Sequence, residues 1–302
     1  MEGKALLFKE FADIDAVPIC LNTKDPQEII QIVKAIAPTF GGINLEDISA
    51  PRCVEIERAL IEALDIPVFH DDQHGTAVVV TAALINALKL VKKEAKDLKV
   101  VISGTGAAGS AIIHMLVDLG VKNIIAFNKD GALNDEMTTA TFVEKEILEL
   151  ISPTDFTGTM PEAFVGADVF IGVSAPNLVT KEMVASMNDG NIVFPMANPE
   201  PEITYDEAIA GGASVVGTGR SDFPNQINNV LAFPGLFRGA FTAEATKITS
   251  RMKLACAHAI ADSIPYGELN SDYIIPSAFD ENVVDLITMK VAEAARKDGV
   301  TR

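Results

Sequence analysis

The chain has 302 residues, 48% of them hydrophobic, so it is long enough for one large or two ordinary domains with a sizeable core. Its 24 Lys and Arg face 42 Asp and Glu, and the net charge of −18 disfavours nucleic acid and anionic membrane as partners. The three cysteines, Cys20, Cys53 and Cys256, are widely spaced, which argues against disulfides and for a reducing compartment. Because the first residues also lack a signal-peptide pattern, we expect a soluble cytoplasmic protein.

The first quarter of the chain alternates between helix-like and strand-like segments, which is typical of α/β proteins with parallel sheets. The expected helices are GKALLFKEFA (3–12), PQEIIQIVKAIA (26–37) and CVEIERALIEAL (53–64). The expected strands are AVPICL (16–21), FGGINL (40–45) and IPVF (66–69). Asp25 is placed to cap the second helix, with Pro26 at its first position. Loops after the strands should gather at one sheet edge, where ligands bind in such folds.

The apolar run from 77 to 90 predicts a buried helix, because it is short for a membrane span and contains Thr and Asn. Beyond it, a strand, a glycine-rich loop, a helix and three more strands follow: KVVIS (99–103), GTGAAG (104–109), SAIIHMLVDLG (110–120), NIIAFN (123–128), ADVFIGVS (167–174) and NIVFPMA (191–197). We therefore expect a Rossmann-type domain over residues 72–228 and a smaller parallel-sheet α/β domain over 1–71. The helical tail, 229–302, is expected to pack back on the first domain.

Gly104, Gly106 and Gly109 form a G-x-G-x-x-G pattern that follows a strand and opens a helix. In this context the glycines let backbone N–H groups approach a pyrophosphate, and the helix N-terminus adds partial positive charge. A tight turn without a ligand is the alternative. The pattern favours a dinucleotide cofactor, NAD or NADP.

The position that normally holds the adenosine ribose carries Asn128 instead of an acid. Asn can bond a hydroxyl but has no charge to repel a phosphate. Lys129 could pair with the 2′-phosphate of NADP, whereas Asp130 would oppose it. The choice of cofactor stays open here with a lean to NAD, and Asn128 could also be an ordinary turn residue.

Two pairs of acids, Glu46-Asp47 and Asp71-Asp72, each follow a strand-like segment. If both strands belong to one sheet, four carboxylates meet at one edge and repel one another unless a cation lies among them. Oxygen ligands favour Mg²⁺ or Mn²⁺. The alternative is that each pair caps its own helix.

His70 and His74 flank the second acid pair with the spacing of a zinc hydrolase motif. The pattern departs from that motif, because Asp71 stands where Glu is needed and Gly75 marks a helix start. We therefore expect both histidines to pack or hydrogen-bond at this corner.

Taken together, GKALLFKEFADIDAVPICL, NLEDISAPRC, VFHDDQHGTA, GTGAAG, FPMANPEPEI and NNVLAFPG resemble the malic enzymes, notably the small bacterial kind, over essentially the whole chain. The resemblance implies NAD(P)-dependent, metal-dependent oxidative decarboxylation of malate to pyruvate and CO₂. It also implies a homodimer or larger homo-oligomer acting on small molecules, namely malate, pyruvate and oxaloacetate. Oxaloacetate decarboxylation without redox and a non-catalytic NAD-binding module are the alternatives.

Carried over by position, the resemblance implies three kinds of site residue. The implied metal ligands are Glu46, Asp47 and Asp72; the implied catalytic pair is Lys4, a general base of depressed pKa, with Asp71 orienting it; and the implied substrate and cofactor contacts are Thr76, Ser174, Asn198 and Asn229. Each also has a plainer interpretation: Lys4 could be a solvated lysine, Asn198 a pre-proline turn residue and Asn229 part of a polar loop.

One departure concerns a tyrosine that the family carries in a segment before the lysine. Here only three residues precede Lys4, and Tyr205, Tyr266 and Tyr273 do not match that motif. Either the chain is a shortened form or a partner supplies the tyrosine, and we expect impaired completion of the reaction, particularly of enolpyruvate tautomerisation.

Overall fold

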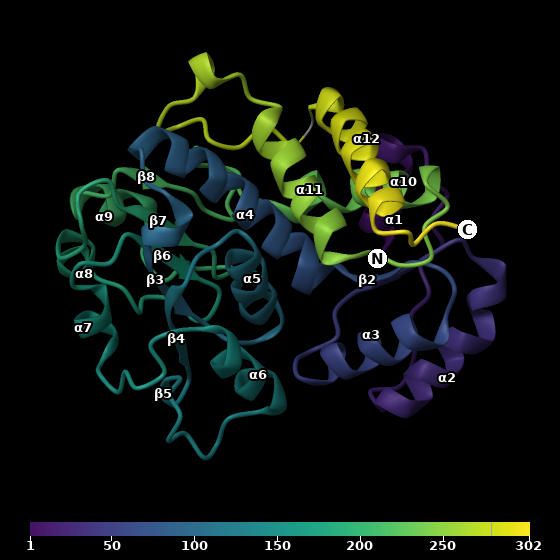
Figure 1. Cartoon of the computed structure of the whole chain (residues 1–302), viewed down its shortest axis with the longest axis horizontal. Helices are drawn as coiled ribbons and strands as arrows, with labels where there is room; N and C mark the ends of the chain where they lie inside the picture. The colour runs from purple at the N-terminus through teal and green to yellow at the C-terminus, as the bar shows by residue number, and fades with distance from the viewer. Residues whose placement is uncertain (279) are drawn as a thin grey trace.

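The computed structural model describes residues 1–278 and 280–302, and within them it contains a small and a large β-sheet (Figure 1). The small sheet pairs β1 (Ile43–Leu45) in parallel with β2 (Val68–His70). The strands of the large sheet, in spatial order, are β5 (Gly131–Ala132), β4 (Asn123–Asn128), β3 (Lys99–Ser103), β6 (Val169–Gly172), β7 (Ile192–Pro195) and β8 (Val215–Val216). All its pairings are parallel except that of β4 with β5. This arrangement confirms the expected α/β class with a Rossmann-type sheet.

The order of the large sheet reverses at β3, whose two neighbours are β4 and β6. Ligands in open α/β sheets bind beyond the carboxyl ends of the strands at such a reversal. The glycine-rich loop follows β3 directly, so the topology places it where a dinucleotide would bind.

Helices cover both faces of the large sheet (Figure 1). The helices are α1 (Glu2–Ala12), α2 (Pro26–Ile36), α3 (Arg52–Ala63), α4 (Asp71–Val91), α5 (Ala107–Asp118), α6 (Phe142–Leu150), α7 (Met160–Phe164), α8 (Lys181–Ala185), α9 (Tyr205–Ala210), α10 (Phe233–Thr242), α11 (Ser250–Asp262) and α12 (Glu281–Lys297), with 3₁₀ turns η1 (Ala37–Thr39), η2 (Ala95–Asp97), η3 (Asn229–Leu231) and η4 (Tyr266–Glu268). As predicted, Asp25 caps α2 by accepting a hydrogen bond from the Glu28 N–H, with Pro26 at the first position.

The helix α4 is the central element of the molecule. It starts at the end of β2, runs for 21 residues and packs against α5 and α11. By length and composition it could cross a membrane, but 67% of its most apolar window is buried inside the protein. It begins at Asp71, before the expected start at 77, because both acids and the glycine that follow β2 belong to its first turns.

The segment AVPICL (16–21) is not a strand, which corrects the sequence-based expectation. In the described residues β1 pairs only with β2, and no strand is assigned between residues 13 and 25. Val17 and Ile19 remain 64% and 38% exposed, and Pro18 has no N–H to offer a partner strand. The β-forming composition alone was therefore insufficient without a neighbour to pair with.

The C-terminal helices join the two parts of the molecule. The helix α10 packs against α1 and α12, and α11 packs against α4 and α12. Phe8 of α1 has its ring centre 4.8 Å from that of Phe233 and 5.4 Å from that of Phe237. The division of the chain at residues 71 and 228 stays our interpretation of this arrangement.

Candidate active site

Side chains from distant parts of the chain meet at the amino group of Lys4. Lys4 lies in α1, Glu46 follows β1, and Asp71 is the first residue of α4. The Lys4 Nζ atom is 3.0 Å from Glu46 Oε1 and donates a hydrogen bond to Asp71 Oδ2. It also lies 4.3 Å from the centre of the Phe233 ring, so an aromatic face completes its surroundings.

The two acid pairs lie at the same edge of the small sheet. Because Leu45 is opposite His70 in the parallel pairing of β1 and β2, the residues that follow each strand are neighbours. The Asp47 N–H donates to Asp72 Oδ2 at 2.8 Å. Asp47 has a φ of 58°, a left-handed conformation that Asp adopts more readily than most residues. Glu46 and Asp71 thus contact Lys4, while Asp47 and Asp72 contact each other at the same sheet edge.

Asp71 is completely buried and held from two sides. Its Oδ2 atom accepts hydrogen bonds from Lys4 and from Asn229 Nδ2, the latter at 2.6 Å, while Oδ1 is buried without a hydrogen-bond partner. A Cβ atom at Gly75 would lie 1.8 Å from Asp71 Oδ1, so only glycine fits there. Asn229, expected at the substrate, therefore orients Asp71 in this structure.

The pKa of Lys4 is shifted in a different direction from the one expected. Burial lowers the pKa of Lys4, but its contacts with Asp71 and Glu46 outweigh this, and the net pKa is raised instead of depressed. Burial also raises the pKa of Glu46, and it raises that of Asp71 to about 7 despite the opposing effect of Lys4. These contacts favour the ammonium form of Lys4, so the pKa is shifted in the opposite direction to the expected one.

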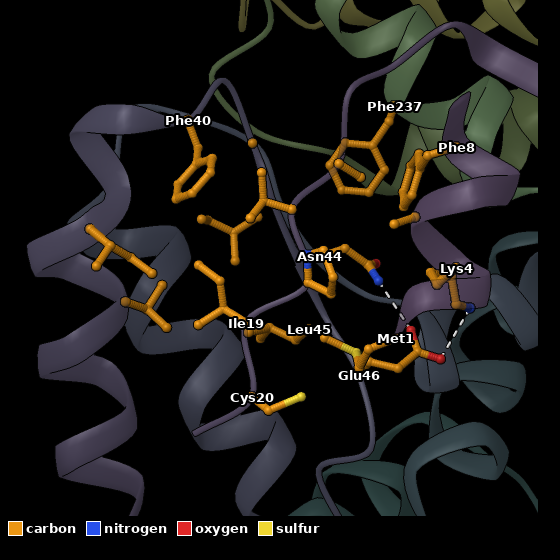
Figure 2. A pocket seen from close by; sticks show the side chains of 18 of the residues that line it. Met1, Lys4, Phe8, Ile19, Cys20, Phe40, Asn44, Leu45, Glu46 and Phe237 are labelled. Carbon is orange, nitrogen blue, oxygen red and sulfur yellow. Dashed lines mark hydrogen bonds and ion pairs between the residues drawn. The ribbon is translucent and has the colours of Figure 1, made fainter. Parts of the chain in front are cut away.

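A pocket of about 500 Å³ opens beside Lys4 and is largely apolar in its lining (Figure 2). Lys4 and Glu46 point toward each other at one end, and Phe8 and Phe237 lie next to each other near them. Glu46 Oε2 also accepts a hydrogen bond from Asn44 Nδ2 at 3.0 Å. The described lining includes none of the three tyrosines of the chain.

The donor chemistry of the acid cluster fits a hard divalent cation. Two carboxylates, Glu46 and Asp71, contact the one amino group of Lys4, and the Oδ1 atom of Asp71 is buried without a partner, so negative charge is in excess. In residues 1–278 and 280–302, however, no three His, Cys, Asp or Glu side chains are arranged closely enough to share one ion. Glu46 and Asp72 contact Lys4 and the Asp47 N–H instead, so coordination requires their side chains to turn.

The histidine corner is anchored by Glu57, a residue that sequence reasoning missed. Glu57 of α3 accepts hydrogen bonds from the His70 N–H at 2.8 Å, from Gln73 Nε2 at 3.3 Å and from His74 Nε2 at 2.8 Å. Lys253 Nζ lies 3.3 Å from the other ring nitrogen of His74. With both nitrogens engaged, His74 is not free to bind zinc, and the network fixes the chain on either side of the acid pair.

A sequence signal for Glu57 was present. It lies on the same helix face as Cys53, Ile56 and Leu60, all of which are buried. An acid inside an apolar helical stripe is a sign of a buried, paired charge. Burial would raise the pKa of Glu57, but His74 and the His70 N–H hold it below its usual value, so it stays ionised.

The glycine-rich loop has a distinct physical reason for each glycine. Gly104 has a φ of +104°, and a Cβ there would lie 2.7 Å from the Val173 carbonyl oxygen. A Cβ at Gly109 would lie 1.8 Å from the Gly104 carbonyl oxygen, so α5 can approach the loop only with glycine. Gly106 faces open space, with nothing within 4 Å of its ideal Cβ. This leaves room for a ligand at the N-terminus of α5.

Ser174 lies directly across from this loop, at the end of β6. Its Oγ atom is 2.7 Å from Ser103 Oγ, and its N–H donates to Glu202 Oε1 at 2.8 Å. The fully buried Glu202 also accepts from the Ala197 N–H at 3.1 Å, so it connects the loops after β6 and β7. Glu202 was missed because nothing in its local sequence distinguishes it from a surface acid.

The other predicted cofactor residues come from three separate parts of the fold. Asn198 is exposed, and its Nδ2 atom is 3.3 Å from the ideal Cβ position of Gly219. Thr76 is half-buried on α4. Asn128 ends β4 and donates from Nδ2 to Glu144 Oε1 at 2.9 Å, so it contacts an acid that sequence reasoning did not single out.

Comparison with known proteins gives one consistent result. Two family models match, described as malic enzyme N-terminal domain over residues 1–61 and malic enzyme NAD binding domain over residues 73–298. The chain is 57% identical to the NAD-dependent malic enzyme of Geobacillus stearothermophilus and 52% identical to the bifunctional malic/malolactic enzyme of Bacillus subtilis, with all of it covered in both cases. It spans 63% of the length of the first and 74% of the second.

The fold agrees with solved structures of the same kind. The malic enzyme of Pyrococcus horikoshii superposes with a TM-score of 0.95 at 45% identity, covering 100% of this chain and 72% of that one. The likeness extends through both sheets and the helical tail, because no part of the chain lies outside it.

Proposed function

The chain belongs to the malic enzyme family, and from this premise we propose that it catalyses the NAD(P)-dependent oxidative decarboxylation of malate to pyruvate and CO₂. The observation that carries the proposal is the meeting of Lys4, Glu46 and Asp71, of which Lys4 and Glu46 also line one pocket. These residues come from three separate segments, so their convergence is a property of the fold and not of a local motif.

The pocket suits a small hydroxy acid. Its walls are largely apolar, and the charged groups Lys4 and Glu46 lie at one end, where they could bind and orient an anionic substrate. Glu46, Asp47 and Asp72 would hold a Mg²⁺ or Mn²⁺ ion. When bound, the ion would withdraw charge from the substrate oxygens, and the nicotinamide would accept the hydride from C2.

Lys4 and Asp71 are the groups that hold and move the proton of the C2 hydroxyl. Lys4 starts as an ammonium group, so it must release its proton before it can accept another. Asp71 is in hydrogen-bond contact with it, and its pKa is raised to about 7. Asn229 keeps Asp71 oriented during this exchange. The proton removed from the hydroxyl is balanced by the one delivered to the carbon that loses CO₂.

NAD is the cofactor we propose. The glycine-rich loop and the open position of Gly106 support dinucleotide binding at the N-terminus of α5. A relative 57% identical to this chain carries NAD dependence in its name. A cytoplasmic location and a homodimer or larger homo-oligomer are part of the same proposal.

The test is a spectrophotometric assay of nicotinamide reduction with malate and Mn²⁺, run with NAD and NADP in turn and coupled to pyruvate determination. We expect equal amounts of reduced cofactor and pyruvate, and no reaction after chelation of the metal. Pyruvate formed from oxaloacetate without cofactor reduction would favour a plain decarboxylase. Cofactor binding without turnover under any divalent metal would contradict the proposed activity of this chain.

The expected need for a tyrosine has its own test. Turnover of malate by this chain is compared with turnover by a form extended upstream of Met1 with a tyrosine-bearing segment. We expect the extended form to release pyruvate faster, because the tyrosine would help to protonate enolpyruvate. Equal turnover in the two forms would contradict that need.

A further inference from the structure

In Rossmann folds the adenosine ribose binds at the end of a particular strand. In this chain the acid near that strand end comes from a different element. An acid at this position normally bonds the ribose hydroxyls of NAD. In this chain the strand β4 ends in Asn128, which carries no charge. The carboxylate of Glu144, sixteen residues later in α6, contacts the Asn128 side chain at 2.9 Å. A carboxylate from the next helix therefore lies beside this strand end.

Glu144 connects the two segments that form the cofactor site. Its Oε1 atom accepts hydrogen bonds from Asn128 Nδ2 and, at 2.7 Å, from Thr105 Oγ1 within the glycine-rich loop. Its Oε2 atom accepts from the Thr141 N–H at 2.8 Å, which completes a capping box at the start of α6. Only 6% of Glu144 is exposed, so these contacts fix its position.

The carboxylate is ionised and it orients the asparagine. Burial raises the pKa of Glu144, but the hydrogen bonds from Thr105, Thr141 and Asn128 outweigh it and hold the pKa below its usual value. With the Asn128 nitrogen donating to Glu144, its oxygen accepts from the Asp130 N–H at 2.8 Å and retains a second lone pair. That oxygen can accept a hydrogen bond from a ribose hydroxyl but can only repel a phosphate.

The surrounding charges add to this preference. Lys129 is the cation nearest in sequence to the strand end, and its amino group lies 3.6 Å from a carboxylate oxygen of Asp130. Its side chain is 89% exposed, so it is not held toward Asn128. Glu144 and Asp130 together outnumber this one lysine, and like charges disfavour the 2′-phosphate that distinguishes NADP from NAD.

We propose that Glu144 determines cofactor specificity, selecting NAD over NADP by orienting Asn128 and by placing a fixed negative charge behind the ribose site. The inference rests on the proposed function only in taking the loop at 104–109 to bind a dinucleotide. It adds a residue outside the G-x-G-x-x-G pattern to the recognition of the cofactor. Glu144 acts through Asn128, so it is a positioning residue.

The experiment measures dissociation constants for NAD and NADP on the whole chain by isothermal titration calorimetry, without malate or metal. Glu144→Gln keeps the shape of the side chain and removes its charge. We expect the ratio of NADP to NAD dissociation constants to fall on the order of tenfold in this variant. In the double variant N128D/E144Q the acid returns to the strand end, and we expect the preference for NAD to be restored.

Thr141→Ala is the matched control, because it weakens the capping box of α6 while leaving the Glu144 charge in place. We expect it to lower the thermal midpoint without changing the ratio of dissociation constants. An unchanged ratio in E144Q, or an equal shift in T141A, would overturn the role of Glu144 while leaving the proposed function intact. Failure of the parent chain to bind either dinucleotide would overturn both proposals.

Discussion

The acid cluster and the glycine-rich loop are built in opposite ways. The loop is local: Gly104, Gly106 and Gly109 lie within six residues, and their backbone makes the site. The acid cluster is assembled from residues 4, 46, 71 and 229, and its side chains make the site. A backbone site depends on space and conformation, whereas a side-chain site depends on the balance of buried charges.

The consequence is that the two regions should respond differently to substitution. Removing one partner from a buried charge cluster leaves the others unpaired, which is costly. Adding a Cβ to the loop instead blocks a close backbone approach. Substitutions in the two regions can therefore be compared, in order of decreasing expected effect.

Among these substitutions, Lys4→Ala in the acid cluster should have the largest effect on turnover. Losing a group that holds and moves the proton should lower kcat by roughly 10²- to 10⁴-fold. NAD binding should be retained, because Lys4 lies in α1 and not at the loop. Steady-state kinetics and NAD titration check this. Lys9→Ala is the matched control, since Lys9 is on the same helix but pairs with the exposed Asp13 and Asp15. Near-parental kcat in K4A would show that Lys4 does not act on the substrate.

Asp72→Asn should weaken Mn²⁺ binding and turnover together. The amide can still accept from the Asp47 N–H, so the corner should keep its shape while losing one charge. We expect a loss of about 10- to 100-fold in metal affinity, comparable to that seen when groups supporting a metal site are removed. Mn²⁺ binding followed by electron paramagnetic resonance measures it, with the exposed Asp97→Asn as control. Parental affinity in D72N would remove Asp72 from the ligand set.

Gly75→Ala and Gly109→Ala compare the two regions directly. Each added Cβ meets an oxygen at 1.8 Å, Asp71 Oδ1 in the first case and the Gly104 carbonyl in the second. Each should cost about 1–3 kcal/mol of folding free energy through overpacking. G75A should reduce turnover while leaving NAD affinity close to parental, and G109A should reduce NAD affinity while leaving Mn²⁺ binding close to parental. Denaturant unfolding with both titrations checks this, and a swapped pattern would mean that the regions are not separate.

Asp168→Asn should have the smallest effect, because Asp168 lies at the opposite end of β6 from Ser174. Burial raises the pKa of Asp168, but hydrogen bonds from Lys93, the Lys99 N–H and Asn188 outweigh it and lower the pKa. Because the pKa of Asp168 is lower in the folded protein than in the unfolded chain, its ionisation stabilises the fold at pH values above the unfolded-state pKa of about 3.9. This stabilisation is lost as the pH falls through the folded-state pKa.

The thermal midpoint of the parent should therefore exceed that of D168N at neutral pH, and the gap should close as the pH falls below about 4. Turnover at neutral pH should remain close to parental. A gap that is constant with pH would mean that ionisation of Asp168 contributes nothing to stability.

The sequence predicted local features well and long-range ones only in part. The strand, loop and helix around Gly104 follow from neighbouring residues, as does the Asp25 cap. The pairing of Lys4 with Asp71 spans 67 residues, and only the family resemblance placed these two in one site. Glu202 and Glu144 became visible only in three dimensions, because their partners lie in other loops.

Two expectations were wrong for the same physical reason, namely that a residue's partners decide its state. The segment 16–21 has the composition of a strand, yet no described strand pairs with it. Lys4 is half-buried, which by itself lowers its pKa, yet two carboxylates reverse the direction. Composition and burial can be estimated from a sequence, but the partners require the fold.

The continuous helix α4 has a geometric consequence for both candidate sites. Asp71 and Asp72 are in its first turn, and it packs farther along against α5, the helix that starts at the glycine-rich loop. It therefore sets both the spacing and the rotational phase between the two sites. One inserted residue would turn the acids by about 100° and shift them by about 1.5 Å relative to the cofactor side. Changes of length should be tolerated in the surface loops of this protein long before they are tolerated within α4.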